Sequence, residues 1–150
     1  MEKSFAILVL CSLTLLGDIP QMFQQGGGNA TYRDRQGRTI GSSTQQGNRT
    51  TYRDSNGRLI GTAVKDSSGR VTYRDSNGRT IGSATQTGGN RTVFRDQNGR
   101  NLGSSSQSGN RTVYRDAQGR TTGSATSTGN GKNTTFRNSN GSFSGTRTGR

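Results

Sequence analysis

Tyr52-Arg53-Asp54-Ser55-Asn56-Gly57-Arg58 is one copy of a short motif that recurs along most of the chain. Its aromatic, Arg and Asp positions return at about equal intervals, beginning at Tyr32 and ending in an altered copy, Phe136-Arg137-Asn138. The successive aromatic residues are spaced 20, 21, 21, 20 and 22 residues apart. A fixed period of this length is typical of one supersecondary unit copied six times, each of which buries surface only against its neighbours.

One copy has the sequence pattern of a β-hairpin. Thr, Tyr, Ile and Val flank the segment 54–57, Asp-Ser-Asn-Gly, which is a turn signal between two strand-forming stretches. A type I turn closed by a Gly bulge is the expected connection, because Gly accepts a positive φ without steric cost. This register predicts that Asp54 lies opposite Arg58, Arg53 opposite Leu59, and Tyr52 opposite Ile60. Thr51 would then face Gly61.

Six such hairpins predict an all-β fold, an antiparallel meander of tandem repeats of about 21 residues. A second turn in each repeat would place Ile40 opposite Tyr52 and Leu102 opposite Tyr114. Because side chains alternate between the faces of a strand, one face carries aromatic and aliphatic residues and the other carries Arg. The expected apolar stripe consists of Tyr32, Ile40, Tyr52, Ile60, Tyr73, Ile81, Phe94, Leu102, Tyr114 and Phe136.

Two other architectures fit the same repeat. A β-solenoid would stack identical residues at about 4.8 Å, which places like charges side by side and is unfavourable. The low hydrophobic content of 23% and the 24 Gly residues also fit a partly disordered chain. The regular positions of the few apolar residues favour the meander.

The N-terminal segment differs from the repeats. Lys3 precedes about a dozen apolar residues, 5–16, the pattern of a secretory signal peptide that is too short to span a bilayer easily. We therefore expect a signal peptide over 1–24, with an indistinct cleavage site, and a Gly-rich lead-in over 25–30. Six hairpin repeats would occupy 31–146 and a disordered tail 147–150. Such a protein would be secreted or held at the cell surface or in the periplasm.

Charge provides the main indication of a binding partner. The chain has 21 basic and 8 acidic residues, and 18 of the basic residues are Arg, which makes planar, bidentate contacts with carboxylate, sulfate or phosphate. An outward Arg row is the candidate polyanion-binding site; a solvated face that prevents aggregation is the simpler interpretation. An acidic polysaccharide or another cell-surface polymer suits this row better than nucleic acid, because aromatics on the opposite face could not stack on bases. The row consists of Arg33, Arg53, Arg74, Arg95, Arg115 and Arg137.

The amino-acid composition argues against a catalytic or metal-binding site. The chain has no His, and its single Cys11 lies within the predicted signal peptide, which removes the usual zinc ligands and nucleophile–base pairs. We expect no enzyme activity, no metal site and no cofactor.

The segment 52–59, Tyr-Arg-Asp-Ser-Asn-Gly-Arg-Leu, resembles the YD repeats of the RHS family, whose core is Tyr-Asp-x-x-Gly-Arg-Leu at a similar period. Here Arg53 stands between the aromatic residue and the Asp. The resemblance covers roughly residues 30–145 and implies a secreted, non-catalytic β-repeat scaffold. The segment 25–30 is similar to the Gln-Gly-Asn segments of curli-type amyloid repeats, which implies a self-assembling matrix subunit as the alternative.

The sequence thus predicts an exported structural repeat protein. It would self-associate through its uncovered apolar face or bind an anionic polymer through its Arg face. The curli-like matrix subunit and a basic nucleic-acid-binding repeat protein are the alternatives.

Overall fold

The computed structural model describes residues 28–149, and every regular element in that range is a β-strand. The N-terminal signal peptide predicted over 1–24 lies outside the described residues. The twelve strands are β1 (Ala30–Asp34), β2 (Thr39–Gln46), β3 (Arg49–Asp54), β4 (Leu59–Lys65), β5 (Val71–Asp75), β6 (Thr80–Gln86), β7 (Arg91–Asp96), β8 (Asn101–Ser108), β9 (Arg111–Asp116), β10 (Thr121–Thr128), β11 (Asn133–Asn138) and β12 (Phe143–Gly149).

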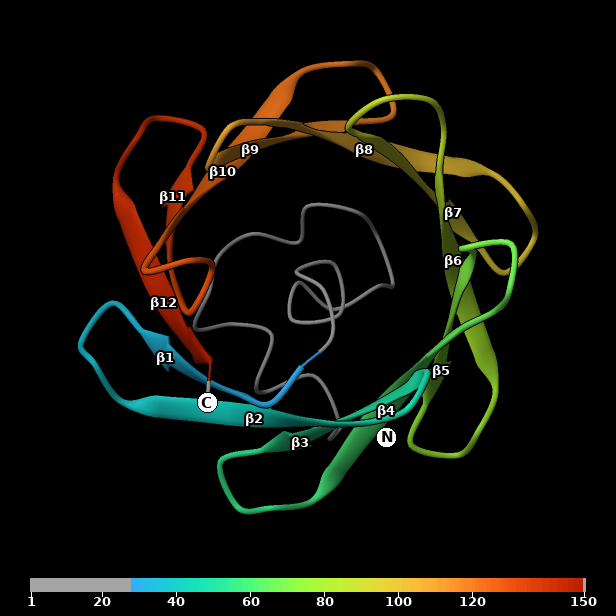
Figure 1. Ribbon diagram of the computed structural model, residues 1–150, viewed down its shortest axis with the longest axis horizontal. Coiled ribbons are helices and arrows are strands. Elements are labelled where there is room, and N and C mark those ends of the chain that lie inside the picture. Colours follow the sequence, from blue (N-terminus) through green and yellow to red (C-terminus); the bar gives the residue numbers. More distant parts are fainter. Residues whose placement is uncertain (1–27, 150) are drawn as a thin grey trace, which may run out of the picture.

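The strands form one closed antiparallel barrel (Figure 1). Each strand pairs with the next along the chain, and β1 pairs with β12 to complete the circle. The predicted hairpin meander is therefore confirmed, and the solenoid alternative is wrong. Closure itself was not predicted. It satisfies the backbone N–H and C=O groups that an open meander would leave unpaired on its two edge strands.

The repeated turn has the predicted geometry. The N–H of Gly57 donates to the carbonyl oxygen of Asp54 at 3.1 Å, and the N–H of Asp54 donates to the carbonyl oxygen of Arg58 at 2.9 Å. Gly57 has a φ of +77°, as the Gly bulge requires. The Asp54 carboxylate accepts the N–H groups of Asn56 and Arg58 at 2.8 and 2.9 Å, so the Asp side chain holds the turn together.

Beyond the turn, a second bulge shifts the strand register away from the predicted one. Arg53 lies opposite Leu59 as expected, but Tyr52 pairs with Gly61 rather than Ile60, and Thr51 pairs with Thr62 rather than Gly61. The register shifts between Tyr52 and Arg53, so that Ile60 is the extra residue of the bulge. Simple alternation of side chains could not reveal this insertion, which recurs in every hairpin.

The pairing across the second turn also differs from the prediction. Tyr52 lies opposite Ser43 rather than Ile40, and Tyr114 lies opposite Ser105 rather than Leu102. Small residues on both sides of the aromatic ring leave it room inside the barrel in every repeat except the first, where Arg147 lies opposite Tyr32. The aliphatic residues, displaced by the bulge, pack against the core from the side.

The predicted apolar stripe lines the inside of the barrel. Its six aromatic residues are buried, and its four aliphatic residues are partly buried against them, together with Ala and Val side chains. Closure therefore covers the face whose exposure suggested self-association. The aromatic residues of the core are Tyr32, Tyr52, Tyr73, Phe94, Tyr114 and Phe136.

The pairing of β1 with β12, which we call the seam, extends beyond the repeat region predicted over 31–146. β12 continues to Gly149 and β1 begins at Ala30, and Ala30 lies opposite Gly149. Residues 147–149, expected in a disordered tail, therefore belong to the strand that closes the barrel. Arg147 lies opposite Tyr32 and Thr134, on the inward face, at the position where the other repeats carry Ala or Ser.

Candidate functional site

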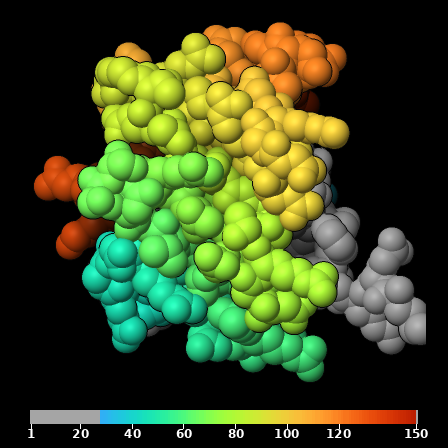
Figure 2. Space-filling model, turned by 90° about the vertical axis from the view of Figure 1, so that its right-hand side faces the viewer, coloured from blue at the N-terminus to red at the C-terminus, as the bar shows by residue number. Residues whose placement is uncertain are grey.

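The six predicted Arg residues lie on the outer wall of the barrel, and all six are exposed. Each follows a buried aromatic residue, so the alternation of side chains that turns Tyr52 inward turns Arg53 outward. We call these residues the arginine ring: Arg33, Arg53, Arg74, Arg95, Arg115 and Arg137. Figure 2 shows neighbouring hairpins, coloured green to yellow, side by side on one face of this wall.

The ring is regular because every hairpin meets the preceding one in the same register. Ser42 lies opposite Arg53 and Thr62 lies opposite Arg74, and the seam between β1 and β12 repeats the pattern with Thr146 opposite Arg33. Equivalent residues are therefore related by successive steps of two strands around the barrel. Two inter-strand spacings amount to about 10 Å.

Each ring arginine is tied to the tip of its own hairpin. Nη1 of Arg53 donates to the carbonyl oxygen of Gly57 at 2.9 Å, and the other five make the same bond at 2.9 to 3.1 Å. A guanidinium group has five N–H donors, and this bond uses one of them. The ring therefore presents oriented cationic donor groups rather than freely rotating side chains.

The carboxylates of the repeats are held within the turns. Asp34 Oδ2 accepts Arg38 Nε at 2.8 Å, and Asp116 Oδ2 accepts Arg120 Nε at 2.7 Å. Burial alone would raise the pKa of Asp34, but hydrogen bonds from the Arg38 backbone and side chain and from the Gln36 backbone lower it overall. The lowered pKa keeps the carboxyl groups of Asp34 and Asp116 charged at neutral pH, where they accept the N–H groups of Gln36 and Gln118.

A second row of arginines lies on the same outer face, which the sequence analysis did not single out. Arg49 precedes Arg53 by four residues on β3, so both side chains point outward. The side-chain alternation could have revealed this row. Its members are Arg49, Arg70, Arg91 and Arg111, and Nη2 of Arg70 donates to Ser83 Oγ at 3.2 Å. Residues 28–149 hold seventeen Arg and two Lys against six Asp, so the wall is strongly positive.

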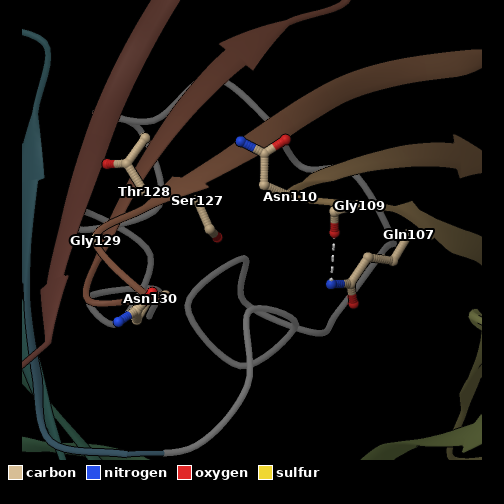
Figure 3. A pocket seen from close by; sticks show the side chains of 8 residues that line it. Gln107, Gly109, Asn110, Ser127, Thr128, Gly129 and Asn130 are labelled. Carbon is tan, nitrogen blue, oxygen red and sulfur yellow. Dashed lines mark hydrogen bonds between the residues drawn. The ribbon is translucent and has the colours of Figure 1, made fainter.

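A hollow of about 530 Å³ opens between the β8–β9 and β10–β11 turns (Figure 3). Amides, hydroxyl groups and glycines line it, and Gln107 Nε2 donates to the carbonyl oxygen of Gly109 at 3.2 Å. Asn130 adopts a φ of +56° in the longer of these turns. The hollow is separate from the arginine ring, since it lies at the end of the barrel opposite the Asp turns.

The aromatic residues of the repeats are withdrawn from the outer surface. Burial, with a smaller contribution from neighbouring Tyr residues, raises the pKa of Tyr52, Tyr73 and Tyr114 far above the usual range for a phenol. Among the described residues, the large hydrophobic side chains that are exposed are Leu59 and Phe143. Phe143 is thus the one aromatic ring with substantial exposure on this part of the chain.

Comparison with protein-family models and with curated proteins found no match for this chain. The resemblance to YD repeats therefore remains a prediction. Among residues 28–149, no three His, Cys, Asp or Glu side chains gather in a way that could hold a metal ion. No helix that could cross a membrane occurs in that range.

Proposed function

We propose that this protein is an exported, non-catalytic repeat scaffold whose outer wall binds an anionic polymer. The observation that carries the proposal is the arginine ring: six exposed guanidinium groups in one register, each oriented by a bond to a Gly carbonyl oxygen. Export rests on the N-terminal sequence pattern of residues 1–24, and the scaffold role rests on the resemblance to YD repeats.

Electrostatics supports a polymeric partner rather than a small anion. A regular array of like charges raises the local concentration of a polyanion, and each neutralised charge on the polymer releases counterions. The six Asp carboxylates offset only part of this charge, because residues 28–149 hold seventeen Arg and two Lys. Guanidinium groups also bind carboxylate and sulfate bidentately.

An acidic polysaccharide is favoured over nucleic acid. Proteins that bind single-stranded nucleic acid combine basic grooves with exposed aromatic platforms on which the bases stack. Here the aromatic residue that precedes each ring arginine is at most 4% exposed inside the barrel, whereas the Arg residues lie outside, and Phe143 is the one exposed ring among the described residues.

The test is retention on immobilised heparin across a salt gradient. The triple variant R53Q/R74Q/R95Q should elute at a lower salt concentration than the parent. The slope of its log affinity against log salt concentration should fall in magnitude by about one unit per lost contact. The matched control is R35Q/K65Q/K132Q, which removes the same charge outside the ring. Far-UV circular dichroism checks that both variants keep the fold. Equal elution of the ring variant and the parent would refute the proposal.

A further inference from the structure

The arginine ring continues around the whole barrel, including the seam. At the seam Arg33 lies opposite Thr146, just as Arg53 lies opposite Ser42 within the chain. A polymer that follows the ring would therefore meet the same chemistry at each step, wherever it starts. A path along a single strand would instead leave the ring after one hairpin.

Small hydroxyl side chains separate the ring arginines. The strand between two ring members presents one Ser or Thr directly opposite the following Arg, and Thr62, Ser83 and Ser104 are at most 6% exposed beneath their neighbours. Arg70 and Arg91 of the second row donate to the hydroxyl groups of Ser83 and Ser104, and the exposed Leu59 lies opposite Arg53 on one of these strands. The surface between ring arginines is therefore covered rather than hollowed. These hydroxyl positions are Ser42, Thr62, Ser83, Ser104, Ser124 and Thr146.

We infer that the ligand is a linear acidic polysaccharide, which runs around the wall across successive hairpins. This inference rests on the proposed function. Neighbouring ring arginines are about two inter-strand spacings apart, roughly 10 Å, which a pair of linked sugar rings can span. Guanidinium groups bind the acidic groups that recur along such a chain.

The bonds to the hairpin tips favour such an extended ligand. Because Arg53 and Arg74 are each fixed to a Gly carbonyl oxygen, neither has to be ordered when a ligand bridges them. A short segment of one chain can bridge two neighbouring groups, whereas two groups separated by a gap need a longer segment. The effective concentration for the second contact is therefore higher when the groups are neighbours, and the chain binds more tightly.

The experiment compares two triple variants that each lose three positive charges and three hydrogen bonds to hairpin tips; the second also loses the bond from Arg115 Nη1 to Thr121 Oγ1. R53Q/R74Q/R95Q keeps three adjacent ring arginines, Arg115, Arg137 and Arg33, across the seam. R33Q/R74Q/R115Q leaves no two adjacent ring members. Binding of a heparin-derived hexasaccharide is measured by titration calorimetry at fixed salt, and thermal unfolding confirms that both variants fold equally well.

We expect the alternating variant to bind at least about tenfold more weakly than the contiguous one, a difference of about 1.4 kcal/mol. Equal weakening of both variants would overturn the inference but leave the proposed function intact. Parent-like binding by both would refute the proposed function itself. Tighter binding of a single-stranded oligonucleotide of equal charge, with the same dependence on adjacency, would overturn the assignment to a polysaccharide.

Discussion

The guanidinium group of Arg53 donates to the carbonyl oxygen of Gly57, across the turn of its own hairpin, at 2.9 Å. The same contact recurs in all six hairpins, including the altered last copy, where Arg137 bonds to Gly141. The repeated Arg therefore has a structural partner as well as an exposed surface, and the two roles can be separated by mutation.

Removal of this contact should have a small effect on stability. Arg53→Met keeps the aliphatic stem but loses a solvent-exposed hydrogen bond, so we expect the free energy of unfolding to fall by less than about 1 kcal/mol. Urea denaturation measures the change. Arg58→Met, at the exposed exit of the same turn, is the control. A loss of several kcal/mol from Arg53→Met alone would show that the Arg chiefly supports the fold.

Closure of the barrel should depend on Gly145. This residue lies opposite Asp34 in the seam, and a Cβ atom there would clash with the carbonyl oxygen of Arg33. We expect Gly145→Ala to lower the free energy of unfolding by about 2 kcal/mol or more, since backbone must shift. Gly141→Ala is the control, because its Cβ would meet open space and the cost is that of a positive φ, about 1 kcal/mol. Equal melting temperatures would contradict this role of the seam.

The fifth hairpin should be stabilised by an apolar substitution. Thr122 occupies the bulge position that Ile40, Ile60, Ile81 and Leu102 occupy in other repeats, and its Oγ1 is buried with no hydrogen-bond partner. Thr122→Val keeps the shape and removes the unsatisfied hydroxyl group, so we expect a gain of about 1 kcal/mol. The reciprocal change, Ile60→Thr, should destabilise the barrel. A lower melting temperature for Thr122→Val would contradict the assignment.

Acid should weaken the turns. Burial acts to raise the pKa of Asp34, Asp66 and Asp116, but hydrogen bonds lower it overall, below the value of an unfolded chain. At Asp66 the hydrogen bond from the Ser68 hydroxyl group is the largest contribution. A lowered folded-state pKa contributes stability that is present above the unfolded pKa, about 4, and is lost as the pH falls through the folded value. The melting temperature of the parent should therefore drop below pH 4.

The variant D34N/D66N/D116N tests the origin of this acid sensitivity. Asn138 already replaces Asp in the last hairpin and keeps the backbone turn, with its N–H bonded to the carbonyl oxygen of Ser142 at 2.9 Å. The triple variant should fold with a lower melting temperature at neutral pH and a flatter profile below pH 4. A profile as steep as that of the parent would assign the acid sensitivity to other groups.

Alkali should unfold the barrel through its buried phenols. Burial raises the pKa of Tyr52, Tyr73 and Tyr114, whereas an unfolded chain ionises its Tyr residues near pH 10. Because the unfolded state then releases protons that the folded state retains, stability should fall as the pH rises above about 10. Phenolate absorbance should appear together with loss of the β circular dichroism signal. Ionisation of these three residues in a chain that is still folded would contradict their burial.

The local structure of the hairpin could be predicted because its determinants are neighbours in sequence. Asp54 and Gly57 specify the turn through the Asp carboxylate and the positive φ, and the alternation of Tyr52 and Arg53 assigns one to each face. The tip bond of Arg53 was not predicted, since no sequence pattern shows where a long, flexible side chain bends.

The partners across the sheet could not be predicted from the same pattern. One inserted residue at Ile60 moves Gly61 opposite Tyr52, and the second turn places Ser43 rather than Ile40 on the other side. A bulge changes the pairing of every residue beyond it without changing the alternation of apolar and polar residues, so the sequence carries no direct mark of it.

By itself, the sequence determined the hairpin unit, its turn, and the separation of aromatic from guanidinium side chains, because these follow from contacts within about twenty residues. Only the tertiary structure decided that the sheet closes and that its apolar face becomes an interior. It also decided that the Arg residues form a ring instead of an open row. Closure depends on the accumulated twist and stagger of twelve strands and on the pairing of β1 with β12, whose residues are more than a hundred positions apart.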